Sequence, residues 1–220
     1  MMLPALIVLC AVSVGAYLYI EAKEKKMPAL LCKGLASLCF VLIGLIYRSD
    51  LYVSDLIFCG LLFGCIADVL VGLRYIFRKI GQQLHLTGIL FFLAGHIAYL
   101  IATLSLSDNW PICIMAGIII SIFFYLWIYK RIIASITLRI VGVIYIGIIT
   151  FLNTSAIGNL ILNPGTFTAL FAFGAVLFLA SDILLILNTF GPKPKRNIRI
   201  IHLSLYYLGQ VLIALSLTFF

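Results

Sequence analysis

Eight apolar runs, each long enough to cross a bilayer, limit what this chain can fold into. A transmembrane helix needs about 20 consecutive, mostly apolar residues, and short polar gaps separate the runs from one another. We therefore predict an all-α fold, in which residues 1–220 form a single domain, a polytopic integral membrane bundle of eight helices. The predicted spans are residues 2–20, 28–46, 51–72, 84–104, 111–129, 135–153, 166–188 and 200–219.

The positions of the basic residues predict how the helices are oriented. All but one of the 15 lysines and arginines lie in the first, third, fifth and seventh loops or within two turns of them, and Arg48 lies on the other side. Because cytoplasmic loops are rich in Lys and Arg, we expect these loops in the cytoplasm and both termini outside, in a bacterial inner membrane, a plasma membrane or an equivalent. The net charge of +8 then reflects topology and contact with membrane lipid, and we expect no nucleic-acid partner.

Asp68 and Asp182 are unusual because each lies within an apolar run. The protein has only seven acidic residues, and a carboxylate at membrane depth is costly enough to mark a functional site. Asp68 precedes Arg74 by six residues and Asp182 precedes Asn188 by six. At about 1.5 Å per residue, both lie roughly 9 Å inside the cytoplasmic end. The other five acidic residues lie at or near the ends of the apolar runs: Glu21, Glu24, Asp50, Asp55 and Asp108.

The two aspartate-bearing spans are also alike in sequence. Residues 67–70 (AlaAspValLeu) in the third span match residues 181–184 (SerAspIleLeu) in the seventh. Spans that are four helices apart run parallel to each other. The match therefore predicts a four-plus-four parallel repeat, which superposition of the two halves would test.

Further polar residues lie inside the fourth, sixth and eighth spans and at the start of the second. Helix residues three or four positions apart share a face, so these side chains can line a polar cavity that opens toward the cytoplasm between apolar walls. Such a cavity suits an amphipathic substrate. The residues are Lys33, His96, Tyr99, Tyr145, Asn153, Tyr206, Tyr207 and Gln210.

Several polar and aromatic residues also have a simpler interpretation. A histidine in a helix is most often a packing residue with a hydrogen bond, and Asn153 and Gln210 can be interhelical hydrogen-bond partners. His85 and His202 lie near loops, where we expect them to be solvated. Six aromatic residues near the ends of the runs are expected to be interface anchors: Tyr17, Tyr19, Tyr47, Tyr52, Trp110 and Tyr129.

Two buried aspartates at one depth are compatible with more than one function. A proton-coupled carrier of an amphipathic solute would use them as proton sites, and a non-catalytic lipid-binding protein would tolerate their loss. A metal-dependent membrane lipid hydrolase would use Asp68, Asp182 and His96 as ligands. Zinc sites usually collect three or more His or Cys ligands, so we expect no metal and no cofactor.

Six short motifs follow one another across nearly the whole chain beyond the first span, at residues 32–35, 62–68, 88–99, 145–153, 174–190 and 206–210. In order and spacing they resemble the lysoplasmalogenase (YhhN-like) family of polytopic membrane proteins. That family usually has Lys-Pro where this chain has Lys33-Gly34, and Ser-x-x-Gly-Asp where this chain has residues 64–68 (GlyCysIleAlaAsp). The missing serine removes one possible hydroxyl partner of Asp68.

The resemblance implies hydrolysis of the sn-1 vinyl ether of a lysoplasmalogen to a fatty aldehyde and glycerophosphoethanolamine or glycerophosphocholine. The reaction starts with protonation of carbon, and burial in hydrocarbon favours the protonated form of a carboxyl group that could supply the proton. A second, ionised carboxylate can stabilise the resulting cation and accept a proton from water. We assign these two roles to Asp68 and Asp182, and the sequence leaves open which one is the acid.

The resemblance also implies roles for the residues around the two acids. The expected partner is a lysophospholipid within membrane lipid, and Lys33 is expected to meet its phosphate. His96, Tyr99, Tyr206 and Gln210 are expected to orient water and the carboxyl groups. The remaining candidate residues on the substrate side are Tyr145, Asn153, Ser181, Asn188 and Tyr207. None of these patterns determines an oligomeric state.

Overall fold

The computed structural model describes residues 2–107, 109–133 and 136–220. Within these residues the eight predicted spans form helices that are long and apolar enough to cross a membrane, which indicates an integral membrane protein. Asp108, and Ser135 at the predicted start of the sixth span, lie outside the described residues. The helices are α1 (Met2–Ala22), α2 (Lys26–Tyr47), α3 (Tyr52–Leu73), η1 (Arg78–Ile80), α4 (Gly81–Ser105), α5 (Trp110–Tyr129), α6 (Ile136–Leu162), α7 (Thr166–Phe190), α8 (Arg196–Ser216) and η2 (Leu217–Phe219).

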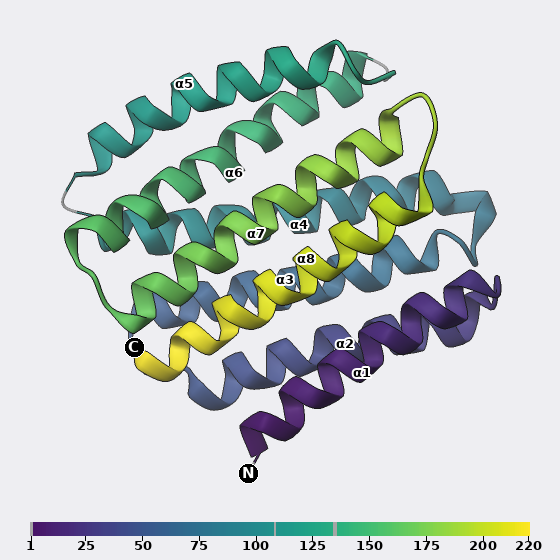
Figure 1. The fold of residues 1–220 in the computed structure, drawn as a ribbon, viewed down its shortest axis with the longest axis horizontal. Coiled ribbons are helices and arrows are strands. Elements are labelled where there is room, and N and C mark those ends of the chain that lie inside the picture. Colours follow the sequence, from purple (N-terminus) through teal and green to yellow (C-terminus); the bar gives the residue numbers. More distant parts are fainter. Residues whose placement is uncertain (1, 108, 134–135) are drawn as a thin grey trace.

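The helices pack side by side in one bundle (Figure 1). The first four pack against one another in sequence order, as do the last four, and contacts of α4 with α6 and of α2 with α8 join the two groups. The α1–α2, α3–α4 and α7–α8 loops lie together at the right of Figure 1, while both chain termini lie toward the opposite end. We call the end of the bundle where these three loops lie the α1–α2 end. Its assignment to the cytoplasm stays a prediction.

The distribution of polar residues is that of a protein surrounded by lipid. Large apolar side chains face outward, among them Ile112, Ile119 and Phe123 of α5. Polar side chains such as Ser37 and Gln210 are buried between helices. Lipid offers no hydrogen-bond partner, so polar groups at membrane depth must find their partners inside the protein. This is why the candidate site residues collect between the helices.

The sixth helix is longer than the sequence predicts. The predicted end at Asn153 is wrong, because α6 continues to Leu162. Asn153 donates from Nδ2 to the carbonyl oxygen of Ile149 over 2.8 Å, and Thr150 and Thr154 also bond to carbonyls of the preceding turn. Polar side chains that bond back to their own helix need not end it.

Two pairs of helices cross at glycines. A Cβ atom added to Gly209 of α8 would lie 2.8 Å from the carbonyl oxygen of Gly174 in α7. A Cβ atom added to Gly95 of α4 would lie 3.1 Å from the carbonyl oxygen of Gly60 in α3. Small residues at these crossings let the backbones approach closely, which fixes α3 against α4 and α7 against α8.

The two crossings are related in the way that a repeat would require. The sequence distance from the α3–α4 glycines to the α7–α8 glycines equals the distance from Asp68 to Asp182. The contact of α4 with α6 likewise has its counterpart in the contact of α8 with α2. These relationships favour the four-plus-four repeat, which stays a prediction until the two halves are superposed.

Candidate active site

The carboxyl group of Asp68, on α3, is surrounded by donors from α2 and α8. The ammonium nitrogen of Lys33 lies 2.9 Å from Oδ1, and the hydroxyls of Ser37 and Tyr206 donate to Oδ2 over 2.6 and 2.8 Å. Asp68 is only 1% exposed and Lys33 only 5%. A cation therefore contacts Oδ1 of Asp68, and two hydroxyl donors contact Oδ2.

A chain of hydrogen bonds extends from Asp68 to α4. The hydroxyl of Tyr99 donates to Oε1 of Gln210 over 2.9 Å. Nε2 of Gln210 donates to the hydroxyl of Tyr206 over 3.5 Å, and that hydroxyl in turn donates to Asp68. The hydroxyl of Tyr207 lies beside this cluster and donates to a backbone carbonyl of α2 over 3.4 Å. Tyr99 of the fourth span and Gln210 and Tyr206 of the eighth therefore form a hydrogen-bonded chain that ends at Asp68.

Asp182, on α7, has a different environment formed by α4 and α6. The hydroxyl of Tyr145 donates to Oδ2 over 2.6 Å, and Nε2 of His96 lies 3.5 Å from the same oxygen. Nδ1 of His96 lies 2.7 Å from the carbonyl oxygen of Phe92. A carbonyl oxygen can only accept, so Nδ1 carries a hydrogen and Nε2 of the neutral ring is an acceptor.

His96 and Asp182 are therefore placed to share one proton. Nε2 of His96 is buried and has no hydrogen-bond partner within the described ranges. A hydrogen on either Nε2 or the neighbouring carboxyl oxygen would bridge the two atoms. Oδ1 of Asp182 makes no hydrogen bond in the described part of the chain, because both Tyr145 and His96 approach Oδ2. This leaves Oδ1 available to another molecule.

Asp68 and Asp182 line the same cavity. It has a volume of about 90 Å³ and lies toward the α1–α2 end, and we call it the inner cavity. Its wall includes Lys33 and Tyr206 beside Asp68, and Phe92 beside Asp182. The carboxyl group of Asp68, which is paired with Lys33, and that of Asp182, which lies beside His96, thus line one cavity.

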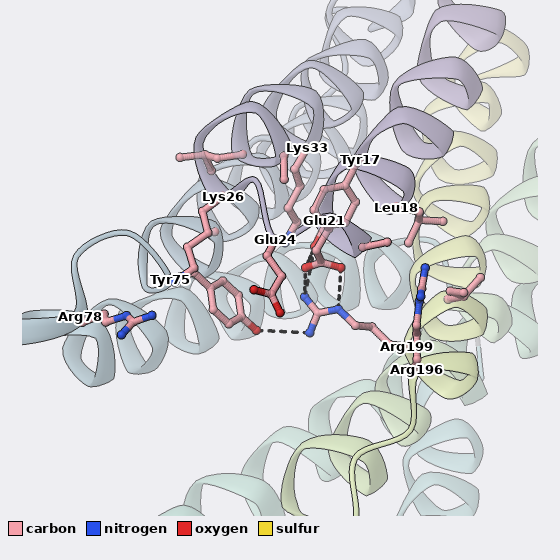
Figure 2. Close-up of a pocket in the computed structure, with 15 residues that line it drawn as sticks. Tyr17, Leu18, Glu21, Glu24, Lys26, Lys33, Tyr75, Arg78, Arg196 and Arg199 are labelled. Carbon is pink, nitrogen blue, oxygen red and sulfur yellow. Dashed lines mark hydrogen bonds and ion pairs between the residues drawn. The ribbon is translucent and has the colours of Figure 1, made fainter.

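Figure 2 shows the residues around a larger cavity of about 460 Å³, the outer cavity, which shares lining residues with the inner one. Tyr17, Lys33, Tyr75 and Arg199 line both cavities, and we call this shared wall the neck. Arg199 binds Glu21 with two nitrogens, one of them Nε at 2.9 Å from Oε2. Its Nη1 also donates to Tyr75 over 3.3 Å, as Figure 2 shows. The neck is therefore built from polar and charged side chains.

Tyr75 lies in the connection between α3 and η1, outside the membrane-spanning segments. Burial raises the pKa of its hydroxyl, but the guanidinium groups of Arg199 and Arg74 more than offset this and hold the pKa below its ordinary value. Both guanidinium groups donate to the Tyr75 oxygen. The rim of the neck therefore has an electropositive character.

On its other side, Asp182 borders a cavity lined mainly by apolar side chains. This apolar cavity, of about 80 Å³, lies between α4, α6 and α7. Phe92 and Asp182 line both it and the inner cavity. A fourth cavity of about 50 Å³ lies toward α5 and shares Gly142 and Ile186 with the apolar cavity. An apolar path therefore begins at Asp182 and leads away from the polar neck.

Three other candidate site residues that were predicted from the sequence have mainly structural contacts. Ser181 donates to the carbonyl oxygen of His202 over 2.7 Å. Asn188 accepts from the backbone N–H of Lys195 over 2.6 Å and so closes the α7–α8 loop. Both also line the inner cavity. Asn153 bonds only within α6 in the described structure, and it joins neither aspartate.

Three residues were assigned to water or to the membrane interface, and the structure corrects these assignments. His202 is buried, and His85 has both ring nitrogens buried without a partner in the described residues; both line the inner cavity. Tyr17 is buried too, and its hydroxyl donates to Glu21 over 3.0 Å. Nearness to a loop does not imply exposure to bulk water here, because these groups are buried inside the protein.

Sequence reasoning named Tyr206 but missed Ser37, the other residue whose hydroxyl binds Asp68. Ser37 takes the place of the serine that the third span lacks, because it follows Lys33 by one helical turn and so faces Asp68 too. That spacing was visible in the sequence. The pairing of Glu21 with Arg199 was not, because it joins α1 to α8.

The donor set suits proton transfer. No three His, Cys, Asp or Glu side chains gather as a possible metal site in residues 2–107, 109–133 and 136–220. What the cavity offers is the carboxyl group of Asp182 beside an imidazole, together with the carboxyl group of Asp68 beside an ammonium group. Such a pair can protonate a bound molecule and stabilise the positive charge that results.

Comparisons with known proteins assign the chain to a family. Curated proteins gave no match, and solved structures gave none. The model of the YhhN family, however, matches residues 28–217. The match runs from α2 to the end of the bundle and includes Asp68, Asp182 and the side chains that contact them. The chain therefore belongs to the YhhN family, which includes lysoplasmalogenases.

Proposed function

We propose that this protein hydrolyses the sn-1 vinyl ether of lysoplasmalogens to a fatty aldehyde and glycerophosphoethanolamine or glycerophosphocholine. Family membership supports a lysoplasmalogenase-like activity. The observation that carries the proposal is that Asp68 and Asp182 face one cavity in unlike environments, one beside an ammonium group and the other beside an imidazole. Hydrolysis of an enol ether uses such a pair, because it needs an acid and passes through a cation.

We assign the role of general acid to Asp182. Within the described residues no lysine or arginine pairs with its carboxyl group, so no cation there favours the ionised form, and only the Tyr145 hydroxyl donates to it. Protonated Asp182 gives its proton to the vinyl carbon that is remote from the ether oxygen. The electron pair of the double bond forms the new C–H bond, and the carbon that bears the oxygen becomes an oxocarbenium ion.

The proton returns to Asp182 when water adds. The water oxygen bonds to the oxocarbenium carbon, and one water proton passes to the Asp182 carboxylate, which gives a hemiacetal. The hemiacetal hydroxyl then loses its proton while the glycerol oxygen gains one, and the bond between that oxygen and the former vinyl carbon breaks. The products are the aldehyde and the free glycerol hydroxyl, and one water is consumed.

Asp68 provides a fixed negative charge in this scheme. Lys33, Ser37 and Tyr206 already donate to its carboxylate, which makes it a weak acceptor for the proton of water. Its charge faces the cavity in which the cation develops, and a fixed charge that needs no rearrangement stabilises a transition state. Tyr206, held by Asp68, lies in the cavity wall and can orient the attacking water.

The cavities suggest how the substrate lies. We place the start of the alkenyl chain in the apolar cavity, which begins at Asp182. The glycerol end then points through the neck at Arg199 toward the outer cavity. This orientation puts the vinyl ether next to Asp182, at the boundary between the apolar and polar parts of the path.

The proposal is tested with detergent-purified protein and isotopic water. Aldehyde should be released from lysoplasmalogen and not from its saturated 1-O-alkyl analogue. In D₂O, aldehyde trapped by reduction should carry one deuterium on the carbon next to the former carbonyl carbon. In ¹⁸O-labelled water, the glycerophospho product should contain no label, because its oxygen stays with glycerol. Label in that product, or no aldehyde at all from folded protein, would contradict the proposal.

A further inference from the structure

We propose that the outer cavity binds the phosphate of the lysophospholipid headgroup through Lys26, Arg78 and Arg196. The inference rests on the proposed function for the identity of the lipid, and it adds the place where the headgroup is held. The volume of the outer cavity, about 460 Å³, is within the range of small-molecule sites. The cavity also adjoins the proposed reaction site through the neck.

Two of the cations that line the outer cavity are already neutralised. Arg199 pairs with Glu21 through two nitrogens. Lys33 pairs with Asp68 over 2.9 Å and is almost fully buried. The expectation that Lys33 meets the substrate phosphate therefore gives way, because its ammonium is occupied by Asp68. A phosphate must be bound by other cations.

Three further cations line the same cavity without a carboxylate partner. Lys26, Arg78 and Arg196 form no ion pair in the described part of the chain, and Glu24 is a lining carboxylate that likewise has none there. Figure 2 shows Arg78 and Arg196 on opposite sides of Glu24 in that view. Positive charge therefore exceeds negative charge around the cavity, which favours an anion. Guanidinium groups suit phosphate in particular, since their planar forks match its oxygens.

The chemistry of the substrate requires a phosphate site near the compartment that holds the vinyl ether. Only the three glycerol carbons separate the ether oxygen from the phosphate ester oxygen in a lysoplasmalogen. With the vinyl ether at Asp182, the phosphate must lie in the next compartment along the polar path. The outer cavity is that compartment, because Lys33 and Arg199 belong to the walls of both cavities.

The experiment compares two triple variants with the same change in charge. The site variant is Lys26→Gln, Arg78→Gln and Arg196→Gln. The matched control is Lys25→Gln, Lys79→Gln and Lys195→Gln, whose residues are the chain neighbours of the first three and do not line the outer cavity. Binding is measured in neutral detergent with two uncleavable probes, a 1-O-alkyl lysophosphoethanolamine and the matching 1-O-alkylglycerol, which lacks the phosphate.

Wild type and control should bind the phosphate-bearing probe about tenfold or more tightly than the alkylglycerol, and the site variant should lose most of that difference. An undiminished difference in the site variant, or an equal loss in the control, would overturn the assignment. Displacement of the lipid probe by an equal concentration of inorganic phosphate would show a general phosphate site and not a headgroup site. Because the probes are not cleaved, a wild type that binds them as expected but releases no aldehyde would refute the proposed reaction and leave the headgroup site standing.

Discussion

The ammonium nitrogen of Lys33 and Oδ1 of Asp68 lie 2.9 Å apart in the interior of the bundle. The two residues come from α2 and α3, and both side chains are almost fully buried. Removing one partner of a buried ion pair is expensive, because the other charge is left without a counterion or water. The pair therefore couples the packing of α2 on α3 to the ionised state of Asp68.

Changing either partner should destabilise the protein. We expect Lys33→Met to cost about 3–5 kcal/mol, because it leaves an ionised Asp68 unpaired, and Asp68→Asn to be costly because it strands the ammonium. The double variant should be more stable than the sum of the single effects predicts. The stability losses of the two single variants and the double variant are measured by thermal unfolding of the purified proteins in one detergent. Strictly additive losses would show that the two side chains do not interact.

Asp182 and Tyr145 should affect turnover more than stability. Asp182→Asn should abolish aldehyde release, because an amide cannot protonate carbon. Tyr145→Phe removes the hydroxyl that holds Oδ2 and should lower kcat about tenfold or more. Tyr52→Phe, at an exposed position of α3, is the matched control and should leave kcat unchanged. Near-normal kcat for Asp182→Asn would remove Asp182 from the mechanism.

The α7–α8 crossing should not tolerate a methyl group. Gly209→Ala would place a Cβ atom 2.8 Å from the Gly174 carbonyl oxygen and 3.2 Å from the Phe178 nitrogen, and we expect a loss of about 1–3 kcal/mol from overpacking. Gly147→Ala in α6 is the control, because a Cβ atom there meets nothing within 4 Å. It should be neutral or slightly stabilising, since alanine favours the helix. Equal unfolding temperatures for the two variants would argue against the close crossing.

Tyr75 should give the protein a stability gain at alkaline pH. Burial raises the pKa of its hydroxyl, but Arg199 and Arg74 hold it below the ordinary 10.0. A pKa lowered on folding adds stability that is fully present above the unfolded value and is lost as the pH falls through the folded value. The unfolding temperature of wild type relative to Tyr75→Phe should therefore rise as the pH is raised from the folded-state pKa of Tyr75 to the unfolded value of 10.0. A difference that does not change with pH would contradict the lowered pKa.

The acid–base route should proceed without a metal. Incubation with EDTA, followed by removal of the chelator, should leave aldehyde release unchanged, because proton transfer from Asp182 and addition of water need no Lewis acid. Loss of activity that Zn²⁺ restores would favour the alternative in which Asp68, Asp182 and His96 bind a metal. A protein treated with buffer alone through the same steps is the control.

The sequence alone was enough to predict the eight helices. Hydropathy is a local property, and a helix in lipid satisfies its own backbone hydrogen bonds. A run of about 20 apolar residues therefore implies a span wherever it occurs. The end of α6 was missed because the polar side chains near Asn153 bond to their own helix and resemble a boundary in the sequence without forming one.

The sequence also identified Asp68 and Asp182, since a carboxyl group in an apolar run is unusual whatever surrounds it. It could not tell the two aspartates apart, because each lies in a similar local sequence. Their partners come from other helices: Lys33 reaches Asp68 from α2, and Tyr145 reaches Asp182 from α6. Only the tertiary structure decides which aspartate meets the cation, because that depends on which helix faces lie against each other.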